Sequence, residues 1–187
     1  PSREAAFIAK IRTVAPQLEI RNLDPILDEM RMIKSPREIA LIRRATRIAG
    51  EAIIEGMRSA TPGMYEYELE AIGDYIFKKH NSQFFAYFSL IASGDNAHFP
   101  HYHASQSRLE NGDMVLWDWG PDYKYYTSDV TRMFPANGKF TKDQRELYGI
   151  YLKLYQALMR SIRPYGTPAE IVKDAVDEMD QIFEAYE

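Results

Sequence analysis

The stretch VLWDWGPDYKYYTSDVTRMF, residues 115–134, decides the fold that this chain can adopt. Its two ends, residues 115–119 and 125–134, are rich in aromatic and β-branched side chains, which favour β-strands. Gly120-Pro121-Asp122 between them has the composition of a turn. The pattern therefore predicts a β-hairpin.

Two acidic residues, Asp118 and Asp129, lie inside these strand-like runs. If the turn centres between Tyr123 and Lys124, the two aspartates face each other directly, with Cβ atoms about 4.5–5.5 Å apart. Two unit charges roughly 5 Å apart repel by about 3 kcal/mol at an effective dielectric constant near 20. Either a shared proton or a bound cation would compensate this repulsion. The alternative is a bulge that shifts the register and turns one aspartate to solvent.

Composition limits the chemistry that is available. The 187 residues suffice for one large domain, or for one domain with part of another, and the net charge of −4 argues against a nucleic-acid or acidic-membrane partner. No apolar run reaches transmembrane length. The absence of cysteine excludes disulfides and thiolate ligands, so any metal must bind through oxygen or imidazole. Such ligands favour Mn²⁺, with Zn²⁺ or Co²⁺ as alternatives. A cytoplasmic location is expected, and export stays open because the chain starts at Pro1.

Helix and strand signals divide the chain into two parts. Residues 1–33 are predicted to be irregular, with a short strand at 18–20, and to form the tail of a preceding domain and a linker. Residues 34–187 are predicted to form the N-terminal part of a second domain. Helix-start signals stand at Ser35-Pro36-Arg37-Glu38, at Thr141 with Gln144, and at Thr167-Pro168-Ala169-Glu170. Strands are expected at residues 84–92, 115–119 and 125–134, and Tyr148 to Tyr155 are expected on the core face of a helix.

The segments that begin at Met57 and Met159 both read Met-Arg-Ser and then a Pro/Gly break, each between a long helix and a second helix. Coincidence between two helical turns is one explanation. The other is an internal duplication of a helix-helix-strand unit, whose second set of strands is missing from this chain.

Four blocks of sequence, taken in order, resemble the Xaa-Pro aminopeptidase and prolidase group of metallopeptidases. They are IKSPREIALIRRA, IASGDNAHFPHYHAS, ENGDMVLWDWG and YYTSDVTRMFPANGKFTKDQRELY. The resemblance extends from Met32 to Phe183, about four-fifths of the chain. It implies the α+β pita-bread fold shared with creatinase and methionine aminopeptidase, pseudo-duplicated and here truncated.

The resemblance also implies roles for three residues. Asp118 would be a ligand of one divalent metal ion and Asp129 would bridge two. His101 would contact the substrate and help to stabilise the oxyanion. A histidine and two glutamates that complete the family's metal site have no counterpart in this chain. His98 and His103 are expected to be surface-loop residues.

The implied activity is hydrolysis of the Xaa-Pro peptide bond by an exopeptidase with two divalent metal ions, most favourably Mn²⁺. The substrate would be a proline-containing peptide, and a homo-oligomer or a complementary C-terminal fragment could be a partner. The 187-residue chain alone is expected to be inactive. Two alternatives stay open: a non-catalytic pita-bread module that binds peptides or proteins, and a metal-free hydrolase of the creatinase kind, which usually lacks the aspartate pair.

Overall fold

The computed structural model describes residues 1–186, which fall into two compact units, Pro1–Leu41 and the chain from Ile42 onward. The division lies inside a helix, α3 (Pro36–Ser59). The boundary predicted between residues 33 and 34 separates functional domains, and it stays a prediction.

The first unit is helical, which corrects the prediction that residues 1–33 are irregular. It contains α1 (Arg3–Val14) and α2 (Asp24–Met32), and residues 18–20 do not form a strand. Neither helix buries a residue. Local signals start them instead: the Ser2 hydroxyl accepts a hydrogen bond from the Ala5 amide, and Pro25 stands in the first turn of α2. Because the apolar residues of α1 do not gather on one face, periodicity gave no sign of that helix.

Helix α3 begins at the predicted capping box. The Ser35 amide donates to the Glu38 carboxylate (2.6 Å), and the Glu38 amide donates to the Ser35 hydroxyl (3.3 Å). A second helix, α4 (Glu66–Lys79), follows the break at Thr61-Pro62-Gly63. Both helices bury one apolar face, which includes Ile48 and Ile53 on α3 and Leu69 and Ile76 on α4.

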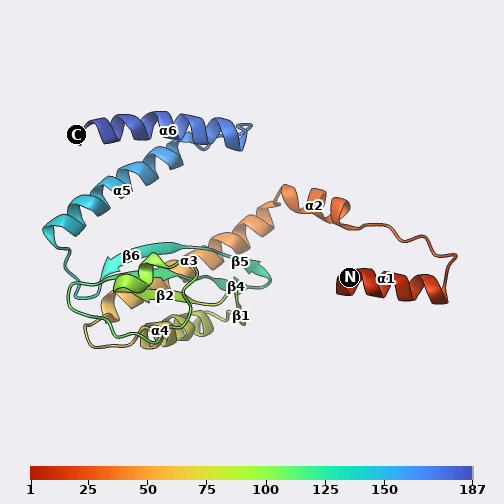
Figure 1. Cartoon of the computed structure of the whole chain (residues 1–187), viewed down its shortest axis with the longest axis horizontal. Coiled ribbons are helices and arrows are strands. Elements are labelled where there is room, and N and C mark those ends of the chain that lie inside the picture. Colours follow the sequence, from red (N-terminus) through yellow and green to blue (C-terminus); the bar gives the residue numbers. More distant parts are fainter. Residues whose placement is uncertain (187) are drawn as a thin grey trace. The chain divides into compact units, whose positions relative to one another are not determined.

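Two small antiparallel sheets follow (Figure 1). One has the order β2-β3-β6, from Leu90–Ser93, Met114–Asp118 and Thr131–Pro135. The other has the order β1-β4-β5, from Phe84–Phe85, Pro121–Tyr123 and Tyr126–Thr127. A 3-10 turn, η1 (Gly94–His98), comes directly after β2. The single strands predicted at residues 84–92 and 125–134 are therefore each broken into two shorter strands.

The hairpin exists, but its predicted register is wrong by two residues. Asp118 pairs with Thr131 instead of Asp129, and the tight turn lies at Lys124-Tyr125, where φ is +53° and +67°. Two consecutive positive φ angles give a turn whose twist suits a two-residue hairpin. The Asp122 carboxylate supports the turn by accepting from the Tyr125 amide (2.8 Å). Turns of this kind normally contain Asn or Gly, so the Lys124-Tyr125 pair did not indicate a turn. The Gly120-Pro121-Asp122 segment was therefore wrongly assigned as the turn.

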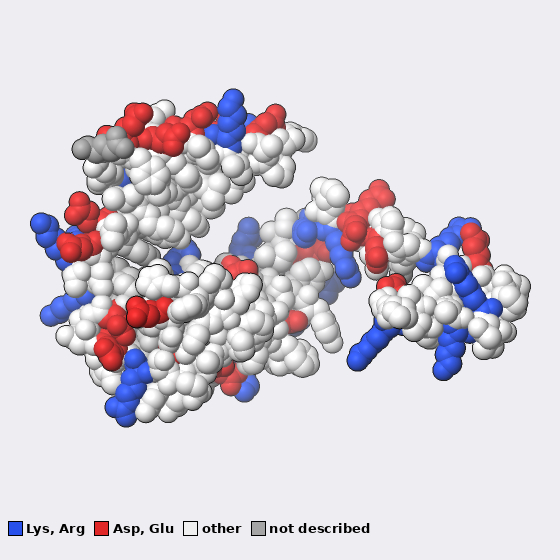
Figure 2. Space-filling view, viewed as in Figure 1, with Lys and Arg blue, Asp and Glu red and all other residues white. Residues whose placement is uncertain are grey.

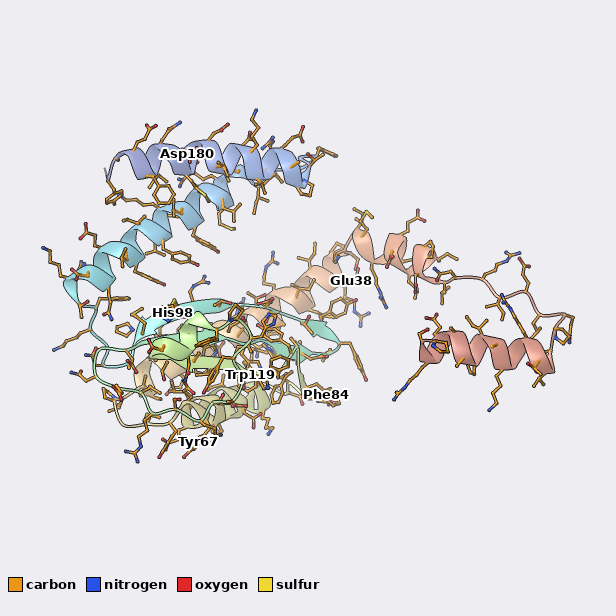
Figure 3. All side chains as sticks on the ribbon, viewed as in Figure 1. Glu38, Tyr67, Phe84, His98, Trp119 and Asp180 are labelled. Carbon is orange, nitrogen blue, oxygen red and sulfur yellow. The ribbon has the colours of Figure 1, made fainter. Side chains whose placement is uncertain are left out.

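The core lies between the β2-β3-β6 sheet and the helices α3 and α4. Trp117 and Trp119 are buried there, and Figure 3 shows Trp119 inside the body with Phe84 at its edge. Glycines let the helices approach the indole rings. A Cβ atom on Gly56 would lie 2.3 Å from the Trp117 ring, and one on Gly73 would lie 2.8 Å from it. Because Trp117 points into this core, Asp118 projects from the opposite face of β3.

Helices α5 (Lys142–Ser161) and α6 (Pro168–Glu184) pack against each other as a hairpin, and both begin at the predicted capping boxes. Acidic side chains gather along the outer side of α6 (Figure 2). Tyr148 and Tyr151 of α5 line a cavity of about 440 Å³ together with Leu116 and Met133 of the sheet. The tyrosines thus face the sheet across this cavity, but the prediction that they lie on a core face is wrong: Tyr151 is 51% and Tyr155 is 37% exposed, and the buried residue of α5 is Ala157. Among residues 1–186, no helix combines the length and apolarity needed to cross a membrane.

Gly120 joins β3 to β4 at a point where no side chain fits. A Cβ atom there would lie 1.7 Å from the carbonyl oxygen of Ser128. We expect Gly120→Ala to lower the free energy of unfolding by at least about 2 kcal/mol, because the two backbone segments must separate. Urea unfolding followed by circular dichroism measures this loss.

Gly50→Ala is the matched control, since Gly50 lies within α3 and a Cβ atom there meets nothing within 4 Å. This substitution should raise the free energy of unfolding by about 0.5–1 kcal/mol. Equal stability of the two variants would contradict the steric argument.

Candidate metal site

The two aspartates come together through the backbone contact at Gly120. Asp118 is the last residue of β3, and Asp129 lies in the segment between β5 and β6, one residue after Ser128. The Ser128 carbonyl lies against Gly120, two residues after Asp118. This contact brings Asp129 beside the end of β3, although the two aspartates are not paired across a ladder.

The hydroxyl group of Tyr87 lies between the two carboxylates. Its oxygen is 2.6 Å from Asp118 Oδ1 and 3.0 Å from Asp129 Oδ1. Two oxygens that both lie within hydrogen-bond distance of one atom are at most about 6 Å apart. The carboxylates thus converge as predicted, and by a different geometry from the predicted one. Asp118 is half-buried, and Asp129 is exposed.

Tyr87 keeps its proton in this position. Burial first, and then the hydrogen bond and negative charge of Asp118, raise the pKa of the Tyr87 hydroxyl well above its ordinary value. A phenol has one proton to donate, so it can serve only one aspartate at a time. The Tyr87 hydroxyl therefore relieves the negative charge of the pair only in part.

The sequence did not indicate Tyr87. It lies between β1 and β2, in the bend that breaks the strand predicted at residues 84–92. The bend is held from the side by Trp119, whose indole N–H donates to the Tyr87 carbonyl (3.0 Å). Since this contact joins residues 32 positions apart, neither local composition nor alternation could have revealed it.

A cavity of about 290 Å³ connects Asp118 with the histidine-containing loop after β2. His98, His101 and Tyr102 line it, together with Leu90 and Leu116 on the sheet. His101 has a φ of +61°, an uncommon conformation for a residue other than glycine. His98 lines the same cavity, whereas the exposed His103 packs edge-on against the ring of Phe88 (5.2 Å between ring centroids). The assignment of His101 as a catalytic residue stays a prediction.

The donor groups suit a hard divalent cation. Two carboxylates that converge from one face supply the oxygen ligands that Mn²⁺ and Mg²⁺ prefer. Within residues 1–186, no group of three or more His, Cys, Asp or Glu side chains is placed to hold a metal ion. The described residues therefore offer two candidate oxygen ligands, and the assignment of Asp118 and Asp129 as metal ligands stays a prediction.

The sequence of this chain matches a known protein family and several curated proteins. Residues 40–185 match the model of metallopeptidase family M24. The chain is 40% identical over 152 residues to the Xaa-Pro aminopeptidase of Escherichia coli, covering 81% of this chain and 34% of that protein. It is 36% identical over 171 residues to the human Xaa-Pro dipeptidase, covering 87% of this chain and 33% of that protein. The chain thus spans about a third of the length of these relatives.

Solved structures of aminopeptidase P have a fold similar to that of this chain. A variant of Escherichia coli aminopeptidase P in complex with substrate has a TM-score of 0.82 and 38% identity, over 87% of this chain and 37% of that one. A candidate aminopeptidase P from Bacillus anthracis has a TM-score of 0.86 and 31% identity, over 100% of this chain and 44% of that one. The predicted fold class, part of a mixed helix-and-sheet pita-bread fold, is confirmed. Because the family model matches most of the sequence and these structures match the fold, the chain belongs to metallopeptidase family M24.

Proposed function

We propose that the whole protein carrying this chain is a dinuclear metal-dependent exopeptidase that hydrolyses the Xaa-Pro peptide bond. One observation carries the proposal: the carboxylates of Asp118 and Asp129 converge on one hydroxyl group, beside a cavity that His101 also lines. The names of the relatives, Xaa-Pro aminopeptidase and Xaa-Pro dipeptidase, support the substrate class. A proline-containing peptide is the proposed substrate.

In this proposal Asp118 and Asp129 hold the metal ions. Bound ions of this kind lower the pKa of water toward neutrality and polarise a carbonyl group. His101 supplies a hydrogen bond to the oxygen of the scissile carbonyl, where negative charge develops in the transition state. Further ligands, a histidine and two glutamates by resemblance to the family, would come from other parts of the whole protein. Mn²⁺ is the proposed ion, with Co²⁺ or Zn²⁺ as alternatives, and a zinc-substituted structure of Escherichia coli aminopeptidase P supports a divalent site.

Electrostatics explains why the aspartate pair favours a cation. Two carboxylates less than about 6 Å apart repel by up to roughly 3 kcal/mol at an effective dielectric constant near 20, although solvent screens the exposed Asp129 in part, and one phenolic proton offsets only part of this cost. A non-catalytic binding module of the same fold would gain nothing from keeping the two charges together. The retained pair therefore favours the metallopeptidase over the binding module.

We expect the 187-residue chain alone to bind Mn²⁺ weakly and to show no appreciable turnover, because two carboxylates leave most coordination positions to water. The whole protein should bind two ions and hydrolyse an Xaa-Pro peptide, and both Asp118→Asn and Asp129→Asn should lower its kcat/KM by at least about a hundredfold. Calorimetric titration with Mn²⁺ and a peptide hydrolysis assay measure these quantities. Tight binding of two ions and steady turnover by the chain alone would contradict the assigned ligand set.

A second prediction concerns the hydroxyl group between the aspartates. Tyr87→Phe should lower the free energy of unfolding of the metal-free protein by about 1–2 kcal/mol, because a charge-assisted hydrogen bond is lost in a half-buried site. In an Asp118→Asn background the same substitution should cost less, since the repulsion is already relieved. Urea unfolding of the four proteins of this double-mutant cycle gives the coupling energy.

Tyr125→Phe is the control for this cycle, because Tyr125 is 86% exposed. If Tyr87→Phe costs no more than Tyr125→Phe, or if the two sites show no coupling, the hydroxyl group does not hold the aspartate pair.

A further inference from the structure

The buried carboxylate of Glu66 has no part in the site described above. Glu66 is the first residue of α4, and its side chain is fully buried (0% exposed). A buried ionised carboxylate is costly unless its oxygens accept hydrogen bonds. Glu66 meets this requirement with donors from one segment only, the chain between the end of β2 and residue 107.

Five hydrogen bonds reach the two oxygens of Glu66. Oε1 accepts from the Ser93 amide (2.7 Å), the Ser93 hydroxyl (2.8 Å) and the Asn96 side-chain amide (3.1 Å). Oε2 accepts from the Tyr102 hydroxyl (2.9 Å) and the Ser107 amide (3.0 Å). The donors thus lie at both ends and in the middle of the loop at residues 94–107, which we call the histidine loop because it carries His98, His101 and His103.

The backbone of the same helical turn adds to this anchor. The amides of Glu66 and Tyr67 donate to the carbonyls of Ser107 and Ser105, both at 3.0 Å. Two amides at the start of α4 are therefore satisfied by carbonyl groups of the loop, and the Glu66 side chain in turn accepts from Ser107 and Tyr102 of the loop. The two ends of the loop are held together by one side chain.

Apolar packing contributes little at the centre of the histidine loop. Residues 98–101, 103 and 104 are exposed, and Tyr102 is half-buried. The Tyr102 hydroxyl is bound to Glu66, while its neighbour His101 has a φ of +61°. Such a conformation persists where the surrounding structure holds it in place. The contact between Tyr102 and Glu66 ties this part of the loop to α4, whereas the other contacts here, from the Tyr102 amide to the Phe99 carbonyl (3.1 Å) and between His103 Nδ1 and the His101 carbonyl (3.1 Å), stay within the loop.

We propose that Glu66 is a positioning residue: it holds the histidine loop closed and so keeps His101 at the cavity that Asp118 lines. The consequence for catalysis rests on the proposed function, whereas the control of the loop does not. Glu66 touches neither the aspartate pair nor, in this proposal, the substrate. It acts through Tyr102 and the loop backbone.

The test uses the whole protein with Glu66→Gln. Glutamine has nearly the same shape, but it replaces one acceptor oxygen with an N–H donor, which would face the backbone amide of either Ser93 or Ser107, and these amides can only donate. We expect amide hydrogen exchange in residues 94–107 to become at least about tenfold faster, with the rest of the protein unchanged. In the hydrolysis assay, kcat should fall at least about tenfold while KM changes much less, because His101 acts in the transition state.

Glu68→Gln is the matched control, since Glu68 lies in the same helical turn, is exposed and contacts the Tyr65 amide instead of the loop. It should leave loop exchange and kcat unchanged. Tyr102→Phe removes one hydrogen bond to Glu66 and should reproduce the local effect in smaller measure, even if Glu66→Gln fails to fold.

The proposal fails if amide exchange in the histidine loop is unchanged in both Glu66→Gln and Tyr102→Phe. It also fails if exchange becomes uniformly faster over the whole protein in both variants. A third contradicting result is faster exchange in the loop together with an unaltered kcat. If the unaltered protein hydrolyses no Xaa-Pro peptide, the proposed function fails. The exchange measurement still decides the role of Glu66 in that case.

Discussion

The contact between the Ser128 carbonyl and Gly120 is the constraint on which the site depends. A Cβ atom at Gly120 would lie 1.7 Å from that oxygen, so only glycine permits the approach. Two chain segments thereby meet at the end of β3, one just after Asp118 and one just before Asp129. The segment Asp118-Trp119-Gly120 therefore has a steric role: its aspartate supplies one carboxylate, and its glycine lets the second carboxylate, that of Asp129, come near.

The carboxylates of Asp118 and Asp129 repel each other, and the structure offsets this repulsion only in part. The Tyr87 hydroxyl donates to the pair, and burial together with the aspartate charges keeps its pKa high, so the proton stays in place. One hydroxyl proton can serve only one of the two carboxylates at a time, so most of the negative charge of the pair stays uncompensated. A divalent cation bound by both carboxylates would offset the remaining negative charge, and the proposed function requires such a cation.

Two carboxylates in this molecule illustrate opposite ways of using a negative charge. Asp118 is half-buried at a cavity, where its free coordination positions are available to a ligand. Glu66 is fully buried, and its oxygens are occupied by five donors from the protein itself. The first arrangement suits binding and the second suits positioning. Both act at one cavity, since the loop that Glu66 anchors carries His101 to the wall that it shares with Asp118.

Features that depend on neighbouring residues could be predicted from the sequence alone. The capping boxes at Ser35, Thr141 and Thr167 are formed as predicted, because their donors and acceptors lie three residues apart. The family resemblance, in turn, correctly selected the fold class.

Features that depend on distant residues were decided by tertiary structure. The hairpin register was set by the positive φ angles at Lys124 and Tyr125. The sequence did not indicate them, because lysine and tyrosine seldom adopt positive φ angles. Tyr87 reaches residues 31 and 42 positions away, and Glu66 reaches residues 27 to 41 positions away. The sequence by itself determined where the capped helices α3, α5 and α6 begin, and it singled out Asp118 and Asp129 as candidates. The tertiary structure alone decided how the two aspartates come together. Hydrogen bonds between distant residues do not change the local sequence pattern, so they cannot be predicted from it.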